Sequence, residues 1–135
     1  GFGKCRLSIC VPASTTIKSA GELNKKRIAT SFPTLTRKFL AAHQAESHIV
    51  ELNGSVEVMI ALGIADAIVD LVETGSTLAA NDLKILTDIG EYETWLIQSP
   101  HCRDAATADR IIRRLEGIVI ARDYTMLEFN ILKSK

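Results

Sequence analysis

The strongest constraint on the fold lies between residues 64 and 80, where a short apolar run is followed by a polar turn. Ala67-Ile68-Val69 is partly β-branched and ends in the acid Asp70, which is typical of a buried strand. Thr74-Gly75-Ser76-Thr77 follows and leads into Leu78-Ala79-Ala80, which suits the start of a helix. The order of strand, acid, glycine-containing turn and helix predicts an α/β unit.

The same turn has the composition of an anion-binding site. Gly75 permits left-handed backbone geometry, so neighbouring N–H groups can converge on one oxyanion. The free N–H groups of a helix start and the hydroxyls of Thr74, Ser76 and Thr77 would add further donors. Asp70 can accept hydrogen bonds from sugar hydroxyls or hold a metal ion. The pattern predicts a phosphate site beside a polyol, although ordinary helix capping explains such a turn equally well.

Strand and helix patterns alternate through the first two-thirds of the chain. Strands are expected at residues 7–11, 27–29, 49–52 and 67–69, and helices at 33–43, 56–62, from 78 onward and at 104–122. Because such alternation implies parallel strands and right-handed crossovers, the expected class is α/β, a mostly parallel sheet with flanking helices. Residues 83–89 and 94–98 are expected to form a hairpin or a bent strand pair, which adds one antiparallel element and places Trp95 in the core. Residues 124–131 are expected to be extended.

A second strand-to-helix turn, Asn53-Gly54-Ser55, is expected at the same carboxyl edge of the sheet. Ser55 is a suitable N-cap and Gly63 a suitable end for a helix over residues 56–62. That helix is apolar nearly all round, so it is predicted to be buried. Glu57, its one charge, either complements the helix dipole or faces a ligand in a cleft, and both interpretations stay open.

Composition excludes several classes of function. Sixteen basic and sixteen acidic residues give a formal net charge of zero, which argues against a general binder of nucleic acids or membrane surfaces. Cys5, Cys10 and Cys102 have no disulfide-framework spacing and fit free thiols in a reducing compartment, so a cytoplasmic location is expected. The three histidines have no metal-ligand spacing, and no metal ligand is assigned. The longest apolar stretch, residues 56–72, carries three acids and is not a membrane span.

The chain resembles a known enzyme family over nearly its whole length. Gly54-Ser55-Val56-Glu57, with the run from Leu62 to Leu78, closely resembles the signature of ATP phosphoribosyltransferases, which open histidine biosynthesis. Further similar segments are Lys26-Arg27-Ile28-Ala29-Thr30, Thr34-Leu35-Thr36 and Arg114-Leu115-Glu116-Gly117-Ile118-Val119. The opening Gly1-Phe2-Gly3-Lys4-Cys5 is most similar to the eukaryotic or long-form branch. Since the chain also begins without Met, a fragment is expected.

The resemblance implies that phosphoribose is transferred from phosphoribosyl pyrophosphate (PRPP) to N1 of ATP, with release of pyrophosphate and with Mg²⁺. It implies a homo-oligomer whose active site lies between two domains resembling periplasmic binding proteins, and histidine as a feedback inhibitor. Residues 1–103 would form the second catalytic domain, and residues 104–135 a helix and strand leading back to the missing first domain and toward a C-terminal regulatory domain. The fragment alone would be inactive, and a plant source would imply a plastid. The alternative is a non-catalytic ligand-binding or regulatory module on the same fold.

The family's binding residues carry over onto two segments. By resemblance, the 5-phosphate of PRPP would bind Thr74, Gly75, Ser76, Thr77 and Leu78, and the ribose hydroxyls would face Asp70 and Glu73. Gly54, Ser55 and Glu57 would line the substrate cleft, and no catalytic nucleophile is assigned. Family members commonly have Arg at the positions of Ser76 and Ala79, and Gly at that of Asp82. These departures predict weaker phosphate binding, because two positive charges are lost and a negative one is added.

Overall fold

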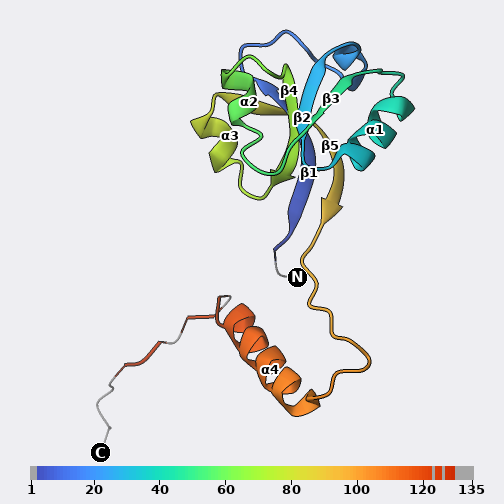
Figure 1. Ribbon diagram of the computed structural model, residues 1–135. Coiled ribbons are helices and arrows are strands. Elements are labelled where there is room, and N and C mark those ends of the chain that lie inside the picture. Colours follow the sequence, from blue (N-terminus) through green and yellow to red (C-terminus); the bar gives the residue numbers. More distant parts are fainter. Residues whose placement is uncertain (1–2, 123, 126, 130–135) are drawn as a thin grey trace, which may run out of the picture. The chain divides into compact units, whose positions relative to one another are not determined.

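The computed structural model describes residues 3–122, 124, 125 and 127–129, and it divides the chain into two compact units (Figure 1). The first, here the sheet unit, spans residues 3–94, and the second, here the helical unit, begins at Trp95. The division therefore falls before the boundary expected at residue 103. Assigning these parts to catalytic domains stays a prediction.

A five-stranded mixed sheet forms the centre of the sheet unit, in the order β3-β2-β4-β1-β5. The strands are β1 (Cys5–Pro12), β2 (Arg27–Thr30), β3 (His48–Glu51), β4 (Ala67–Val72) and β5 (Leu83–Tyr92). β2 pairs in parallel with β3 and β4, whereas β1 is antiparallel to both β4 and β5. The α/β class is confirmed, but the antiparallel element is β1 and not a hairpin after residue 83.

The expected hairpin is wrong because β5 is one continuous strand. It runs through the polar residues Gly90 and Glu91, where a turn was predicted, and residues 94–98 form no strand. β1 pairs with β5 over its full length, from Cys5 opposite Tyr92 to Pro12 opposite Leu83, with two register irregularities. Backbone pairing to β1 therefore outweighs the turn-like composition.

Helices cover both faces of the sheet, so the core has two layers of apolar side chains. On one face, Leu7, Ile9 and Val69 pack with residues of η1 (Ala20–Leu23) and α1 (Pro33–Ala42). On the other, Ile68 and Val72 pack with α2 (Val58–Ala61) and α3 (Ser76–Ala80). Alternate residues of β1 and β4 enter opposite layers, as the period of a strand requires.

α2 is shorter and more exposed than the sequence predicted. Val56 is buried, but Val58 and Leu62 are 39% and 62% exposed, so the helix does not lie wholly inside the core. It ends at Ala61, with Leu62 as its C-cap, and Gly63 follows with φ of +67°, which confirms the predicted glycine terminator.

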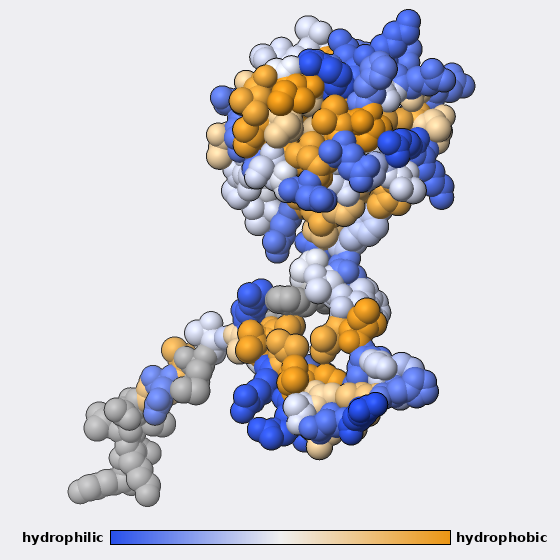
Figure 2. Space-filling view, in the orientation of Figure 1, coloured by the Kyte–Doolittle hydropathy of each residue, from blue (hydrophilic) through white to orange (hydrophobic). Residues whose placement is uncertain are grey.

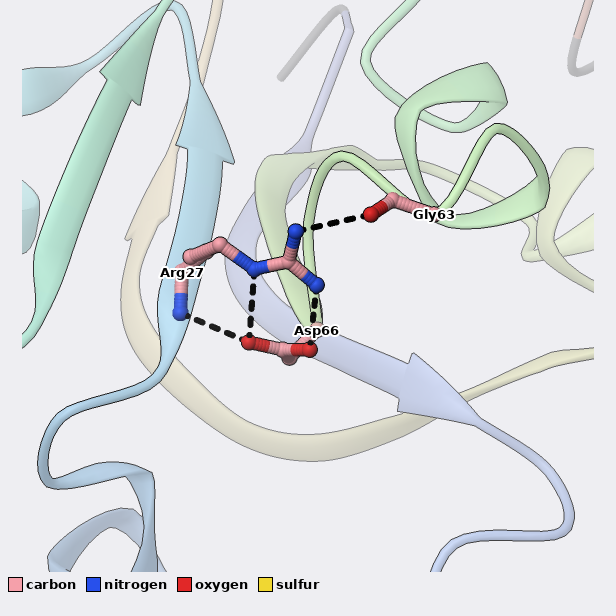
Figure 3. A network of polar contacts seen from close by, with 3 residues as sticks. All are labelled: Arg27, Gly63 and Asp66. Carbon is pink, nitrogen blue, oxygen red and sulfur yellow. Dashed lines mark hydrogen bonds and ion pairs between the residues drawn. The ribbon is translucent and has the colours of Figure 1, made fainter.

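A polar network ties the amino ends of β2 and β4 together (Figure 3). Arg27 donates to both carboxylate oxygens of Asp66, at 3.2 Å from Nε and 2.8 Å from Nη2, and its Nη1 lies 2.7 Å from the Gly63 carbonyl oxygen. The Arg27 backbone N–H also donates to Asp66. These bonds lower the pKa of the Asp66 carboxyl from 3.8 to about 2.

The helical unit contains α4 (Ala105–Arg122), which buries none of its residues. Ile111, Leu115 and Ile118 of its apolar stripe are 51%, 43% and 58% exposed. Trp95 is 76% exposed, so its predicted place in the core is wrong. In Figure 2 the hydrophobic (orange) atoms of this unit gather in broad groups.

The end of the chain only partly tests the sequence analysis. Among residues 124–131, those that the structure describes form no strand, and the rest of that predicted segment lies outside the described residues. No helix in the described part of the chain is long and apolar enough to span a membrane.

Candidate functional site

The carboxyl edge of the sheet collects the segments singled out from the sequence. β2, β3 and β4 run in parallel and all end at this edge, as predicted. Because β1 is antiparallel to β4, the start of β1 lies at the same edge, with Arg6 opposite Val72. β5 ends there too, with Tyr92 opposite Cys5. Polar loops from five strands therefore meet at one side of the sheet unit.

The turn after β4 has the left-handed glycine that the sequence predicted. Gly75 has φ of +80° and stands directly before α3, and a Cβ on it would meet open space. The hydroxyls of Thr74 and Ser76 lie 3.1 Å apart, and the Ser76 N–H donates to Thr74 Oγ1 at 3.4 Å. Glycine is needed here for its backbone conformation and not for lack of space.

Three N–H groups of this turn remain available to a ligand. The backbone N–H groups of Gly75, Thr77 and Leu78 have no hydrogen-bond partner among the described residues. α3 has only five residues, so a helix dipole contributes little. An anion at this turn would therefore be bound by individual N–H and hydroxyl groups, and less by the helix dipole than the sequence suggested.

Leu78 differs from the other residues of the turn because its side chain is buried. The Leu78 side chain is only 8% exposed and packs in the core beside Ile68 and Val72, so only its backbone can meet a ligand. Glu73 is exposed, as are Thr74, Ser76 and Thr77. The buried leucine anchors the turn and the exposed residues form its ligand-accessible part.

Asp70 and Glu57, which are distant in sequence, lie close enough for their charges to interact. Asp70 is half-buried on β4, and its Oδ1 accepts the Leu71 N–H at 2.8 Å. Burial and the charge of Glu57 together raise the pKa of the Asp70 carboxyl above 3.8, against the lowering effect of that N–H. Both carboxylates can accept hydrogen bonds from hydroxyl groups.

The Asn53-Gly54-Ser55 turn differs from its prediction. Gly54 and Ser55 have φ of +82° and +52°, so Ser55 is in the left-handed region and does not cap the helix. The N-cap of α2 is Glu57, without a side-chain capping bond. The Gly54 N–H donates to Ser31 Oγ at 3.4 Å, which links this turn to the loop after β2. Gly54, Ser55 and Glu57 were predicted to line the substrate cleft. Among the described residues, only Glu57 of these three interacts with Asp70, through its charge.

The sequence analysis missed a row of polar side chains across β4, β1 and β5. Ser8 pairs with Asp70 on one side and Asp88 on the other, so the three side chains share one face. Ser8 Oγ, fully buried, donates to Asp88 Oδ1 at 2.6 Å. Asp88 Oδ2 lies 3.0 Å from Arg6 Nη1. The available signal was Arg6 and Ser8 at alternate positions of an otherwise apolar strand.

A cavity of about 510 Å³ opens where this row meets the carboxyl edge. Its lining comes from β1, β4 and β5 and is strongly charged: Lys4, Cys5, Arg6, Val72, Glu73, Glu91, Tyr92 and Glu93. Glu73 connects the cavity to the turn at Thr74. The cavity is thus adjacent to the candidate anion site.

Cys10 lies under the same face and is chemically inert in the folded chain. Its side chain is fully buried, and burial together with the charges of Asp70 and Asp88 raises the pKa of the thiol to about 12, against the opposing effect of Arg6. All three cysteines are free, which agrees with the absence of a disulfide framework.

The site offers no cage for a resident metal ion. The described residues include no group of three or more His, Cys, Asp or Glu side chains arranged to hold one. Asp82 has φ of +53°, so its backbone is left-handed. Asp tolerates that conformation better than most residues other than glycine do.

Comparison with known proteins gives consistent results. The family model of ATP phosphoribosyltransferase matches residues 1–117. The ATP phosphoribosyltransferase of Rhodopirellula baltica is 58% identical over 135 residues, which are 100% of this chain and 45% of that protein. That of Xylella fastidiosa strain 9a5c is 40% identical over 131 residues, covering 95% of this chain and 43% of that protein. The chain therefore spans less than half the length of these relatives.

Solved structures agree on the fold. The ATP phosphoribosyl transferase (HisG:HisZ) complex from Thermotoga maritima matches with a TM-score of 0.65 at 31% identity, over 86% of this chain and 55% of that chain. The structure of Tv2483 bound to L-arginine matches with a TM-score of 0.69, over 90% of this chain and 53% of that chain, but at 18% identity it supports the fold alone.

Proposed function

The chain belongs to the ATP phosphoribosyltransferase family, and on this premise we propose that it forms the PRPP-binding part of such an enzyme. The parent protein would transfer phosphoribose from PRPP to N1 of ATP, which is a glycosyl transfer and the first step of histidine biosynthesis. The observation that carries the proposal is the turn after β4, where free N–H groups and hydroxyls follow Asp70, whose carboxyl interacts with the charge of Glu57 at the start of α2.

The turn is proposed to bind the 5-phosphate of PRPP. The N–H groups of Gly75, Thr77 and Leu78 and the hydroxyls of Thr74, Ser76 and Thr77 are donors without a basic side chain among them. Asp70 and Glu57 would accept hydrogen bonds from the ribose hydroxyls, with Glu73 beside them. Gly54 and Ser55 would border the nucleotide side of the cleft.

In this role the chain's residues contribute binding and orientation. Holding the ribose by its hydroxyls and its phosphate fixes C1 for attack by N1 of ATP, and the bond from C1 to the pyrophosphate oxygen breaks as the new bond forms. No side chain is proposed as a nucleophile. Mg²⁺ would arrive as part of the substrate, bound to the diphosphate of PRPP, because the described residues provide no cage for it.

Further properties of the parent follow only as proposals from the family. The parent would be a cytoplasmic homo-oligomer, and histidine would act as its feedback inhibitor. The chain alone would give no turnover, and formation of phosphoribosyl-ATP by the chain alone would contradict this. A non-catalytic binding module on the same fold is not favoured, because the relatives with substantial identity are transferases.

The test is calorimetric titration of Mg²⁺–PRPP into the chain and its Thr77→Ala and Asp70→Asn variants. Both substitutions remove a proposed contact and should weaken binding by about tenfold or more. Thr34→Ala, which removes an exposed hydroxyl from α1, is the matched control and should bind as the unsubstituted chain does. Binding that survives in both site variants would overturn the proposal, after circular dichroism shows that all four proteins fold.

A further inference from the structure

Arg6 stands beside the candidate phosphate turn although it lies far from that turn in the sequence. It pairs with Val72, two residues before Thr74, across the β1–β4 ladder. It also lines the 510 Å³ cavity together with Glu73, the residue directly before Thr74. A ligand at the turn that extends along the edge towards β1 therefore enters the cavity that Arg6 borders.

The guanidinium of Arg6 is oriented but only partly used. Nη1 donates to Asp88 Oδ2 at 3.0 Å, and Ser8 Oγ fixes the other oxygen of Asp88 at 2.6 Å. Nε and Nη2 donate to no other residue among those that the structure describes. The group thus keeps donors for a ligand while its direction is set by the exposed carboxylate of Asp88, which the buried Ser8 hydroxyl holds in place.

Few basic side chains other than Arg6 are available to a ligand near the turn after β4. The segment from Asp70 to Asp82 contains no Lys or Arg. Arg27 is committed to Asp66 at the opposite edge, and Lys84 Nζ donates to the carbonyl oxygens of Ala13 and Thr15. Lys4 and Arg6 are the two cations that line the cavity.

The same cavity carries Glu73, Glu91 and Glu93, which would repel a bare anion. A phosphate group that carries a divalent cation suits such a mixed lining, because Arg binds phosphate oxygens while carboxylates face the cation or its waters. We propose that Arg6 is a binding residue for the diphosphate of PRPP in its Mg²⁺ complex, while the turn after β4 holds the 5-phosphate. This inference rests on the proposed function.

The test compares two ligands that differ in the diphosphate: Mg²⁺–PRPP and ribose 5-phosphate with Mg²⁺. Binding to the chain is measured by calorimetry and, at millimolar ligand, by ³¹P NMR. Arg6→Gln should weaken Mg²⁺–PRPP about tenfold or more and leave ribose 5-phosphate within about twofold. Thr77→Ala should weaken both ligands, because both carry the 5-phosphate.

Two controls separate a ligand contact from a structural role. Asp88→Asn removes the charge that pairs with Arg6 but keeps the guanidinium, so it should leave PRPP binding within about threefold. Arg27→Gln removes the other ion-paired arginine of the sheet and should change neither ligand.

The outcomes are distinct. Loss of PRPP binding alone in Arg6→Gln, with both controls intact, supports the inference. Equal losses for both ligands, equal losses in Arg6→Gln and Asp88→Asn, or no loss in Arg6→Gln overturns it, while the proposed function stands if Thr77→Ala still weakens binding. No binding of either ligand by the unsubstituted chain at millimolar concentration overturns the proposed function for this chain, and the inference with it.

Discussion

The sheet unit and the helical unit contain similarly apolar stretches, yet they bury them to opposite extents. Leu7, Ile9 and Ile68 in the strands are at most 1% exposed, whereas Ile97 of the helical unit is 91% exposed and Ile118 is 58% exposed. In the sheet unit these three side chains pack within the two core layers between the sheet and its helices. Apolar patterning therefore predicts which face an element will bury, while burial itself depends on a partner surface.

The largest expected difference between the two units is in thiol reactivity. Cys102 is exposed and Cys10 is fully buried with a pKa near 12, so a thiol reagent at pH 8 should modify Cys102 at least about a thousandfold faster. The rates are measured separately on Cys5→Ser/Cys10→Ser and Cys5→Ser/Cys102→Ser chains. Similar rates would show that the sheet unit opens easily and that the contrast between the units is wrong.

Truncation of matched isoleucines tests the same contrast in free energy. Ile68→Ala should lower the free energy of unfolding by about 3 kcal/mol, because it leaves a cavity between β4 and the α2–α3 layer. Ile118→Ala on α4 should change it by less than about 0.5 kcal/mol, because that side chain is 58% exposed. Denaturant unfolding followed by circular dichroism measures both values. A large effect of Ile118→Ala would mean that α4 packs on something in solution.

Substitution of Arg27 tests whether its hydrogen bonds to Asp66 and Gly63 stabilise the sheet unit. Arg27→Gln should slightly lower the free energy of unfolding at neutral pH, because the ion pair is largely exposed but multiply hydrogen-bonded. The lowered Asp66 pKa stabilises the fold above about pH 4, and this contribution is lost as the pH falls through about 2. The difference between variant and unsubstituted chain should shrink over that range. Arg37→Gln, at an exposed position of α1, is the control, and equal effects would exclude the network as the cause.

The smallest expected effect is an increase in the free energy of unfolding, unlike the decreases expected above. The Asp70 pKa is raised in the folded chain, so its contribution to stability is present below about pH 4 and lost as the pH rises through the folded value. Asp70→Asn should therefore slightly stabilise the sheet unit at pH 7, whereas under the proposed function it should weaken PRPP binding. Thermal unfolding at pH 7 measures the shift. A destabilised variant would show that the carboxylate is held by contacts stronger than its repulsion from Glu57.

The local part of the fold was predictable from the sequence, and the long-range part was not. Pro33 and the recurring apolar residues after it predicted α1, and Gly75 predicted the left-handed turn before α3. β5 was misread because Gly90 and Glu91 look like a turn unless β1 is known to lie beside them. Trp95 was placed in a core because an aromatic residue in an apolar pattern usually has a partner.

The candidate site was likewise predictable from the sequence only where its residues are contiguous. The turn from Thr74 to Leu78 is contiguous, so its composition was enough to single it out. The interaction of Asp70 with Glu57 depends on the packing of α2 beside β4, and the position of Arg6 depends on the register of an antiparallel strand. Ser55 failed as a cap because its backbone is left-handed, and no sequence rule for N-caps reveals that conformation.

The pairing of Cys5 with Tyr92 has a consequence for how such a unit can be built into larger proteins. The chain enters the sheet at the first residue of β1 and leaves it at the last residue of β5, and these residues are neighbours across one ladder. A segment whose two ends adjoin can be inserted into a host loop, or rejoined end to end and opened elsewhere, without rearranging its sheet. The sheet unit therefore has the connectivity of an insertable domain, and the edge that carries the candidate site is the edge at which a host chain would join it.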